Sequence, residues 1–283
     1  MTGIPLARLL EFVAEDAPFG DVTSDAVLDC QRCTAVLRFR EAGIAAGLAE
    51  AAALFAYYGV VVTGSAADGD RVEAGATVLA LEGPVRSVLL VERTALNLVG
   101  RMSGIATATA RYVALAGAGG GQVRVAATRK TAPGLGLLDK KAVLLGGGDP
   151  HRFTLSDGVL IKDNHLALVP IEEAVRRARA FSAYKTVEVE VETADEAIRA
   201  ARAGADIVLL DNMTPVEVRE TLALLESAGL RDRVRVEVSG GITEATIGAY
   251  AALGIDLVSV GALTHSVRSL DLTLEVAAPQ PTD

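Results

Sequence analysis

The sequence predicts an α/β protein with an N-terminal α+β module and a larger unit that forms a (β/α) barrel of about six parallel strands. Three observations support this prediction. The chain has 283 residues, of which 51% are apolar, so it can bury a sizeable core. From residue 122 onward, short apolar segments alternate with amphipathic ones. One strand of this region carries carboxylates on a single face, which is more typical of a barrel than of an open sheet.

The first part of the chain, residues 1–116, has the pattern of an α+β module with an antiparallel sheet. Apolar residues at helical spacing near residues 6–13 precede a turn over residues 15–21. Further strands are predicted at 34–40, 60–63 and 77–81, residues 68–72 are predicted to form a turn and a strand, and helices are predicted at 49–58 and 88–116. The glycines at 117–121 mark the domain boundary, and we expect the tail 267–283 to pack back on this first domain.

The second domain, residues 117–266, consists of repeated β-α units, which indicate a parallel sheet. Its predicted strands are 123–127, 159–161, 186–191, 207–210, 234–238 and 257–260. Its predicted helices are 135–145, 171–181, 194–203, 215–227 and 243–253.

The strand over residues 186–192 favours a closed sheet. Valines alternate there with Glu188, Glu190 and Glu192. An inner strand of an open α/β sheet has helices on both faces and would not carry three carboxylates on one of them. In a barrel the valines can face the helices while the glutamates face the interior and its mouth. An exposed edge strand is the alternative that this pattern leaves open.

Composition excludes several classes of function. The net charge of -9 and a pI near 5.0 argue against nucleic-acid binding. No apolar run is long enough to cross a bilayer, and no signal peptide is recognisable, so we expect a cytoplasmic protein. Cys30 and Cys33 form a single C-x-x-C pair, which is a weak metal signal without a second pair.

The polar residues with functional chemistry follow the predicted strands. Glu190 lies within its predicted strand. The others lie at or just beyond the carboxyl end of a strand: Arg129, Lys130, Lys162, Asp163, Asp211, Ser239, Gly240, Gly241 and Gly261. Barrel enzymes place their active sites at that face. The roles of His165 and His265 are not indicated by the sequence, and Thr214 is a better cap than Asp211 for the helix from Pro215.

These residues fall into three chemical groups. Arg129, His151, Arg152 and Lys162 are cations suited to a polyanionic substrate. Glu190 and Asp211 suit sugar hydroxyls or a hard divalent cation. The glycine-containing loops after the last two strands let backbone N–H groups approach a phosphate.

Together, the motifs strongly resemble quinolinate phosphoribosyltransferases. They include T-R-K-T-x-P-G-L, K-x-A-V-x-x-G-G-G, L-I-K-D-N-H, E-V-E-V, L-L-D-N, S-G-G-I and S-V-G-A-L-T-H-S, and they extend over nearly the whole chain. The resemblance implies an N-terminal α/β sandwich, an incomplete barrel, and a homodimer or higher oligomer with shared active sites. It also implies transfer of a phosphoribosyl group from phosphoribosyl pyrophosphate to quinolinate with loss of CO2, assisted by Mg²⁺, in NAD biosynthesis.

The resemblance further implies a role for each site residue. Arg129, Arg152 and Lys162 would hold the pyridine dicarboxylate, with Lys130 and His151 beside them, and Arg93 would reach in from the partner subunit. Glu190 and Asp211 would bind ribose hydroxyls or Mg²⁺. Ser239, Gly240, Gly241 and Gly261 would bind the 5′-phosphate. Lys130, Lys162, Glu190 and Asp211 would be the catalytic residues.

Three positions depart from the family pattern and leave alternatives for the acceptor. They are Ala127, Gly136 and Pro150. The P-H-R sequence resembles the molybdenum-transport-associated ModD branch, which implies a phosphoribosyltransferase with another acceptor. A barrel lyase that uses Lys162 as a Schiff-base nucleophile is a remote alternative. A non-catalytic phosphate-ligand sensor is disfavoured by the presence of both Glu190 and Asp211.

Overall fold

The computed structural model describes residues 4–118 and 122–278, which fall into two compact units. The first unit comprises residues 1–108, 137–147 and 267–283, and the second comprises 109–136 and 148–266. Residues 1–3, 119–121 and 279–283, including most of the predicted glycine-rich boundary, lie outside the described residues. Within the described ranges, no helix is long and apolar enough to span a membrane.

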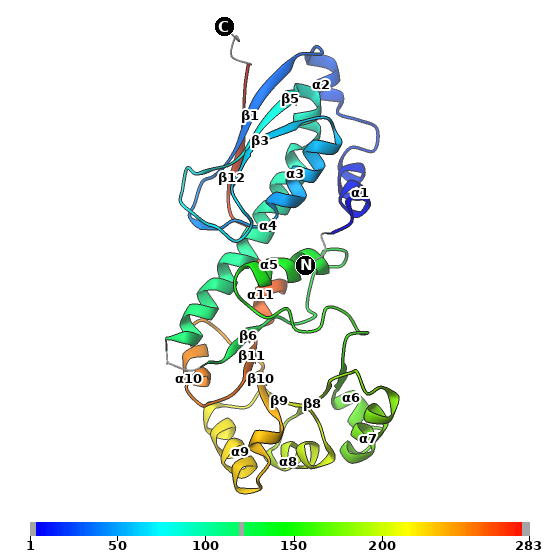
Figure 1. The fold of residues 1–283 in the computed structure, drawn as a ribbon, viewed down its shortest axis with the longest axis vertical. Coiled ribbons are helices and arrows are strands. Elements are labelled where there is room, and N and C mark those ends of the chain that lie inside the picture. Colours follow the sequence, from blue (N-terminus) through cyan, green and yellow to red (C-terminus); the bar gives the residue numbers. More distant parts are fainter. Residues whose placement is uncertain (1–3, 119–121, 279–283) are drawn as a thin grey trace. The chain divides into compact units, whose positions relative to one another are not determined.

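The first unit is built on a four-stranded antiparallel sheet with the order β12–β1–β5–β3 (Figure 1). Its strands are β1 (Arg32–Phe39), β3 (Val61–Ser65), β5 (Thr77–Pro84) and β12 (Leu272–Ala277), and β2 (Gly43–Ile44) pairs with β4 (Arg71–Val72). Alternate residues of β1 are buried, as expected for a sheet with one face on the core. Helix α3 (Leu48–Tyr57) packs against β3 and β5.

Three further helices belong wholly or partly to this unit. They are α1 (Leu6–Asp16), α2 (Val22–Val27) and the first part of α4 (Val85–Gly117). The sequence predicted only the turn before α2, which is a six-residue helix capped by the Asp21 carboxylate. The C-terminal segment runs directly against α4, because a Cβ on Gly104 would overlap the carbonyl oxygen of Arg268.

Helix α5 (Gly136–Leu145) corrects the predicted domain division. The sequence placed this helix among the barrel helices, but residues 137–147 belong to the first unit. Long-range ion pairs explain the difference. Lys141 Nζ lies 2.8 Å from Glu50 and 2.9 Å from Asp68, and Asp139 accepts two hydrogen bonds from Arg101. Glu50 and Asp139 are buried, so these contacts hold α5 in the first unit.

The second unit contains six parallel strands in the order β6–β11–β10–β9–β8–β7. Their bounds are β6 (Arg124–Ala126), β7 (Val159–Ile161), β8 (Val187–Val191), β9 (Ile207–Asp211), β10 (Arg235–Ser239) and β11 (Leu257–Ser259). The first strand pairs with the last, so the sheet curls like a barrel. No ladder joins β6 to β7 in the described residues, so the barrel is incomplete, as expected.

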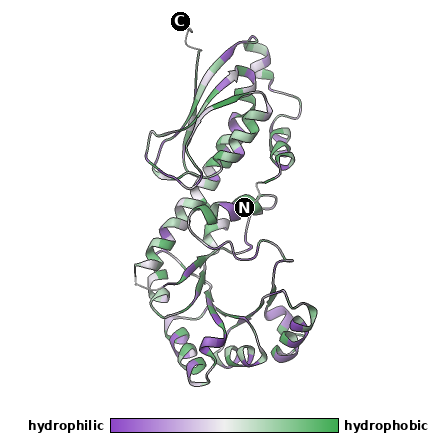
Figure 2. Ribbon diagram, viewed as in Figure 1, coloured by the Kyte–Doolittle hydropathy of each residue, from purple (hydrophilic) through white to green (hydrophobic). Residues whose placement is uncertain are grey.

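Helices surround the curved sheet (Figure 1). They are α6 (Asp163–Leu166), α7 (Ile171–Phe181), α8 (Ala194–Ala203), α9 (Pro215–Ser227), α10 (Ile247–Ala251) and α11 (Ala262–His265). Hydrophobic and hydrophilic residues alternate along them (Figure 2), and Ile171, Val175 and Ala178 form the buried face of α7. Thr193 and Thr214 begin α8 and α9 with capping boxes, so Thr214 rather than Asp211 caps α9.

Candidate active site

A pocket of about 510 Å³ lies at the carboxyl ends of the barrel strands. It brings together residues from the ends of all six strands and the loop before β7. Ten of the residues predicted from the sequence line it: Arg129, Lys130, His151, Arg152, Lys162, Glu190, Asp211, Ser239, Gly240 and Gly241. We call this cavity the mouth pocket. The agreement follows from the fold, because the carboxyl ends of parallel strands meet at one face.

Two predicted residues do not line the mouth pocket. Gly261 lies just outside its lining and next to Lys130, because a Cβ on Gly261 would lie 3.4 Å from Lys130 Cδ. Arg93 is an exposed residue of α4 in the first unit.

The cations of the mouth pocket gather on one side. Lys162, directly after β7, forms an ion pair with Glu190 on β8. Arg152 is half-buried, and its guanidinium donates to the carbonyl of Gly158 at 3.3 Å. Burial and the nearby charge of Arg129 both lower the pKa of Arg152. Two guanidinium groups that repel each other are well placed for an anion with two carboxylates, because the anion would relieve their repulsion.

The opposite side carries a carboxylate and a glycine loop. Asp211 ends β9, and its Oδ2 accepts a hydrogen bond of 2.7 Å from the Asn212 side chain. Gly240 has φ 95° and Gly241 has φ 61°, conformations that favour glycine. A Cβ on Gly240 would lie 2.9 Å from the backbone N of Asn212. The loop carries no side chain at these two positions of the pocket lining, which suits the close approach of a phosphate.

Sequence reasoning missed Asn212 and Glu237, which also line the mouth pocket. Asn212 adopts φ 55°, and its N–H donates to the carbonyl of Ser239 at 2.9 Å, which ties the end of β9 to the glycine loop. Glu237 alternates with the valines of β10 as Glu188 does with those of β8. The same alternation could therefore have identified Glu237 as an interior residue.

The two other histidines and the two cysteines lie outside the mouth pocket lining. Each histidine contacts a residue close to it in the sequence. His165 Nδ1 accepts the backbone N–H of Lys162 at 3.0 Å, which supports the turn into α6. His265 Nδ1 lies 2.6 Å from the Ser266 hydroxyl. Cys30 is exposed and Cys33 is buried, and both are free thiols.

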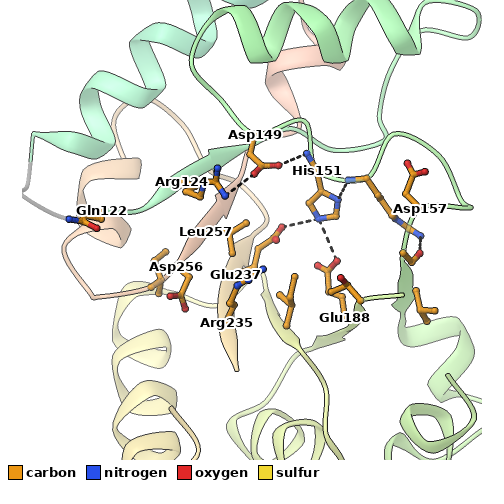
Figure 3. A pocket seen from close by; sticks show the side chains of 16 residues that line it. Gln122, Arg124, Asp149, His151, Asp157, Glu188, Arg235, Glu237, Asp256 and Leu257 are labelled. Carbon is orange, nitrogen blue, oxygen red and sulfur yellow. Dashed lines mark hydrogen bonds and ion pairs between the residues drawn. The ribbon is translucent and has the colours of Figure 1, made fainter. Parts of the chain in front are cut away.

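A histidine and two glutamates converge inside the barrel (Figure 3). His151 Nε2 lies 3.5 Å from a carboxylate oxygen of Glu188 and 3.5 Å from one of Glu237. Burial opposes the protonation of His151, but the two adjacent carboxylates outweigh it and raise its pKa to about 10. Burial also raises the pKa of Glu188. The three groups titrate together, so the raised pKa belongs to the cluster, and Nδ1 accepts the backbone N–H of Arg152.

This cluster predicts a pH dependence of stability. It binds more protons in the folded protein than in the unfolded chain, so its contribution is complete below pH 6.5 and is lost as the pH rises toward about 10. We expect the melting temperature of the unmodified protein, measured relative to Glu188→Gln/Glu237→Gln, to fall over that range. A constant difference between the two proteins from pH 6.5 to pH 10 would contradict the assignment.

A second cavity of about 530 Å³ opens at the amino ends of the strands (Figure 3). We call it the amino-end cavity. Its lining includes Arg124, Asp157, Arg235 and Asp256, and it shares His151, Arg152 and Glu237 with the mouth pocket. The two cavities are similar in size, so size does not identify the site. The mouth pocket alone combines the glycine loop, Asp211 and the Lys162–Glu190 pair.

Comparisons with known proteins agree with this geometry. The family described as "Quinolinate phosphoribosyl transferase, C-terminal domain" matches residues 105–275, and its N-terminal domain counterpart matches residues 21–103. The chain belongs to the quinolinate phosphoribosyl transferase family.

Relatives within this family are similar over almost their whole length. A protein of Methanothermobacter thermautotrophicus named "Probable nicotinate-nucleotide pyrophosphorylase (carboxylating)" is 48% identical over 94% of this chain and 96% of its own. The human nicotinate-nucleotide pyrophosphorylase (carboxylating) is 38% identical over 98% of this chain and 93% of its own. The crystal structure of NadC from Streptococcus pyogenes superimposes with a TM-score of 0.91 at 38% identity, covering 99% of this chain and 100% of that one.

These relatives support the main functional prediction over its alternatives. The names of the curated relatives correspond to carboxylating pyrophosphorylases, as expected for a pentosyltransferase of NAD biosynthesis. They therefore favour quinolinate as the acceptor over a ModD-like acceptor, and phosphoribosyl transfer over Schiff-base lyase chemistry at Lys162.

Proposed function

We propose that this protein transfers the phosphoribosyl group of phosphoribosyl pyrophosphate to quinolinate and releases pyrophosphate and CO2 to give nicotinate mononucleotide. One observation supports this proposal most strongly. A single pocket holds cations for a dicarboxylate on one side and a glycine loop for a phosphate on the other, with Asp211 and Glu190 among its lining residues. A reaction that joins two anionic substrates requires such an arrangement.

The acceptor side of the pocket orients quinolinate. Arg129, Arg152 and Lys162 would bind its two carboxylates, with Lys130 and His151 beside them. The ring nitrogen then bonds to C1 of the ribose as the bond from C1 to the pyrophosphate oxygen breaks. The C2 carboxylate leaves as CO2, its electron pair stays on C2, and C2 takes up a proton. The cations around the ring stabilise the charge that develops in these steps.

The donor side of the pocket holds phosphoribosyl pyrophosphate. Ser239, Gly240 and Gly241 would bind its 5′-phosphate, and Gly261 follows the neighbouring strand. Glu190 and Asp211 would bind ribose hydroxyls or Mg²⁺. Two carboxylates fit Mg²⁺, which proteins commonly hold through one or two carboxylates and substrate phosphate oxygens. When bound, Mg²⁺ would neutralise charge on the departing pyrophosphate.

The proposal extends to assembly and location. It includes a homodimer in which Arg93 of one subunit serves the mouth pocket of the other, and the exposure of Arg93 leaves it available for that role. It also includes residence in the cytoplasm, and the acidic composition supports the absence of nucleic-acid partners.

The assay that tests the function uses the purified protein with Mg²⁺, phosphoribosyl pyrophosphate and quinolinate labelled in its C2 carboxylate. We expect labelled CO2 and nicotinate mononucleotide in equal amounts. The contrasting acceptor is nicotinate, which has no carboxylate at C2. Turnover of neither acceptor, with phosphoribosyl pyrophosphate still bound, would move the assignment to another acceptor.

Mixing two inactive variants tests the shared site. Arg93→Ala and Arg152→Ala should each be inactive alone, but subunit exchange should restore up to about a quarter of full activity. In a mixed dimer one mouth pocket then contains both arginines. Arg86→Ala provides a matched control on the same helix, because Arg86 already pairs with Asp25. No recovery after verified subunit exchange would mean that Arg93 serves its own subunit or none.

A further inference from the structure

The strands β8 and β10 place two glutamates in one layer inside the barrel. Each comes from an alternate strand, with β9 between them, and side chains from alternate strands share a layer in barrels. Glu237 is 0% exposed and Glu188 is 4% exposed. Their layer lies where the mouth pocket and the amino-end cavity meet, since Glu237, His151 and Arg152 line both.

These two carboxylates have few polar partners besides the imidazole ring of His151. Both oxygens of Glu237 and Oε1 of Glu188 receive no hydrogen bond in the described part of the chain. Their ion-pair partner there is His151 Nε2, at 3.5 Å from each (Figure 3). Burying two carboxylates is costly, so a purely structural role would be served better by apolar residues of similar volume. The carboxylates therefore require an explanation in terms of His151.

The backbone of His151 is held in a conformation that few residues adopt. Its φ is 54°, and its N–H donates to Asp149 Oδ1 at 2.8 Å. The ring Nδ1 accepts the backbone N–H of Arg152 at 2.8 Å. A left-handed histidine persists only when its surroundings determine it, and such residues concentrate at functional sites. The Nε2 edge of the ring thus contacts the glutamates, and the Nδ1 edge contacts the Arg152 backbone.

The hydrogen bond to Nδ1 argues against a metal site formed by His151, Glu188 and Glu237. The three groups are close enough to one another, within 4.8 Å, to surround a metal ion. Coordination by Nε2 would require a lone pair there and the ring proton on Nδ1. Because Nδ1 accepts the Arg152 N–H, the ring proton is on Nε2 and points at the carboxylates. The ring therefore presents its N–H to the two glutamates, at 3.5 Å from each.

We propose that Glu188 and Glu237 are positioning residues that act through His151: they fix the imidazole, and the imidazole fixes Arg152 so that its guanidinium meets a carboxylate of the acceptor. This inference rests on the proposed function. The chain of contacts is continuous, from the carboxylates through Nε2 and Nδ1 to the backbone of Arg152. It assigns acceptor affinity to two buried carboxylates through their contact with His151.

The experiment measures KM for quinolinate and for phosphoribosyl pyrophosphate in three variants. Glu237→Leu removes one acceptor oxygen pair at similar volume, and Glu237→Gln keeps an oxygen that Nε2–H can reach. His151→Asn removes the ring, and asparagine tolerates the left-handed backbone. We expect Glu237→Leu and His151→Asn each to raise KM for quinolinate about tenfold, because small misplacements of a binding group are costly. Glu237→Gln should stay within about threefold of the unmodified protein.

Two comparisons separate this role from a structural one. KM for phosphoribosyl pyrophosphate should change less than about twofold in all three variants. In the His151→Asn background, Glu237→Leu should add less than about twofold, because both changes break the same chain of contacts. Equal shifts in both KM values, or a full additional effect in that background, would overturn the inference.

Each remaining outcome is also decisive. If Glu237→Leu does not fold, Glu188→Leu replaces it with the same expected results. An unchanged KM for quinolinate in His151→Asn would by itself reject the inference. Failure of the unmodified protein to turn over quinolinate would reject the proposed function instead, so the two failures are distinguishable.

Discussion

Replacing Asp211 with asparagine is expected to lower kcat by about 100-fold or more. The side chain keeps its shape and its contact with Asn212, but it loses the charge that would bind the ribose hydroxyls or Mg²⁺ at the donor side of the mouth pocket. KM for quinolinate should change less than about threefold, because Arg129, Arg152 and Lys162 hold the acceptor. Steady-state kinetics with each substrate varied in turn would measure both constants.

Asp232→Asn is the matched control for this change. Asp232 is exposed and lies just before β10, at the amino end of the sheet. The same loss of one negative charge there should leave kcat unchanged. If the two variants lose equal activity, the effect of Asp211→Asn is one of net charge, and the donor-side role assigned to Asp211 is wrong.

Replacing Arg152 with alanine is the second change with a large expected effect. We expect kcat/KM for quinolinate to fall by about 100-fold or more, because removing one partner of a desolvated charge pair leaves the other unpaired. Arg152→Lys should recover only part of the loss, since lysine cannot make the two parallel hydrogen bonds of a guanidinium to a carboxylate. Affinity for phosphoribosyl pyrophosphate, measured by calorimetry without quinolinate, should stay close to that of the unmodified protein.

Arg235→Ala distinguishes the two cavities in the same assay. Arg235 is exposed and lines the amino-end cavity but not the mouth pocket, whereas Arg152 lines both. Arg235→Ala should therefore retain full activity. A larger loss in Arg235→Ala than in Arg152→Ala would place the acceptor at the amino ends of the strands.

The strands of the second unit and most of its site were predictable because local patterns determine them. Short apolar segments followed by polar residues identify strand ends, and parallel connectivity brings those ends to one face. Glu188 and Glu190 were expected in the interior from their alternation with valines, and the structure buries Glu188 and places Glu190 in the mouth pocket. Glu192 lies beyond β8 and is exposed.

The features that the sequence did not predict depend on distant contacts. Helix α5 has the pattern of a barrel helix, but Lys141 meets Glu50 and Asp68 from residues far earlier in the chain. The left-handed backbone of His151 arises from Asp149, the two glutamates and Arg152 together, and no local pattern shows such a combination. The structure also shows the surroundings of two departures from the family pattern. Ala127 is buried, and a Cβ on Gly136 would lie 3.3 Å from Thr131 Oγ1.

A crystal structure of the protein with quinolinate tests the central claim most directly, because it shows where the acceptor binds. We expect quinolinate in the mouth pocket, with its carboxylates within hydrogen-bonding distance of Arg129, Arg152 and Lys162 and its ring nitrogen facing the side of Asp211. Quinolinate bound in the amino-end cavity beside Arg124 and Arg235, or bound in the mouth pocket without contact to Arg152, would contradict the account.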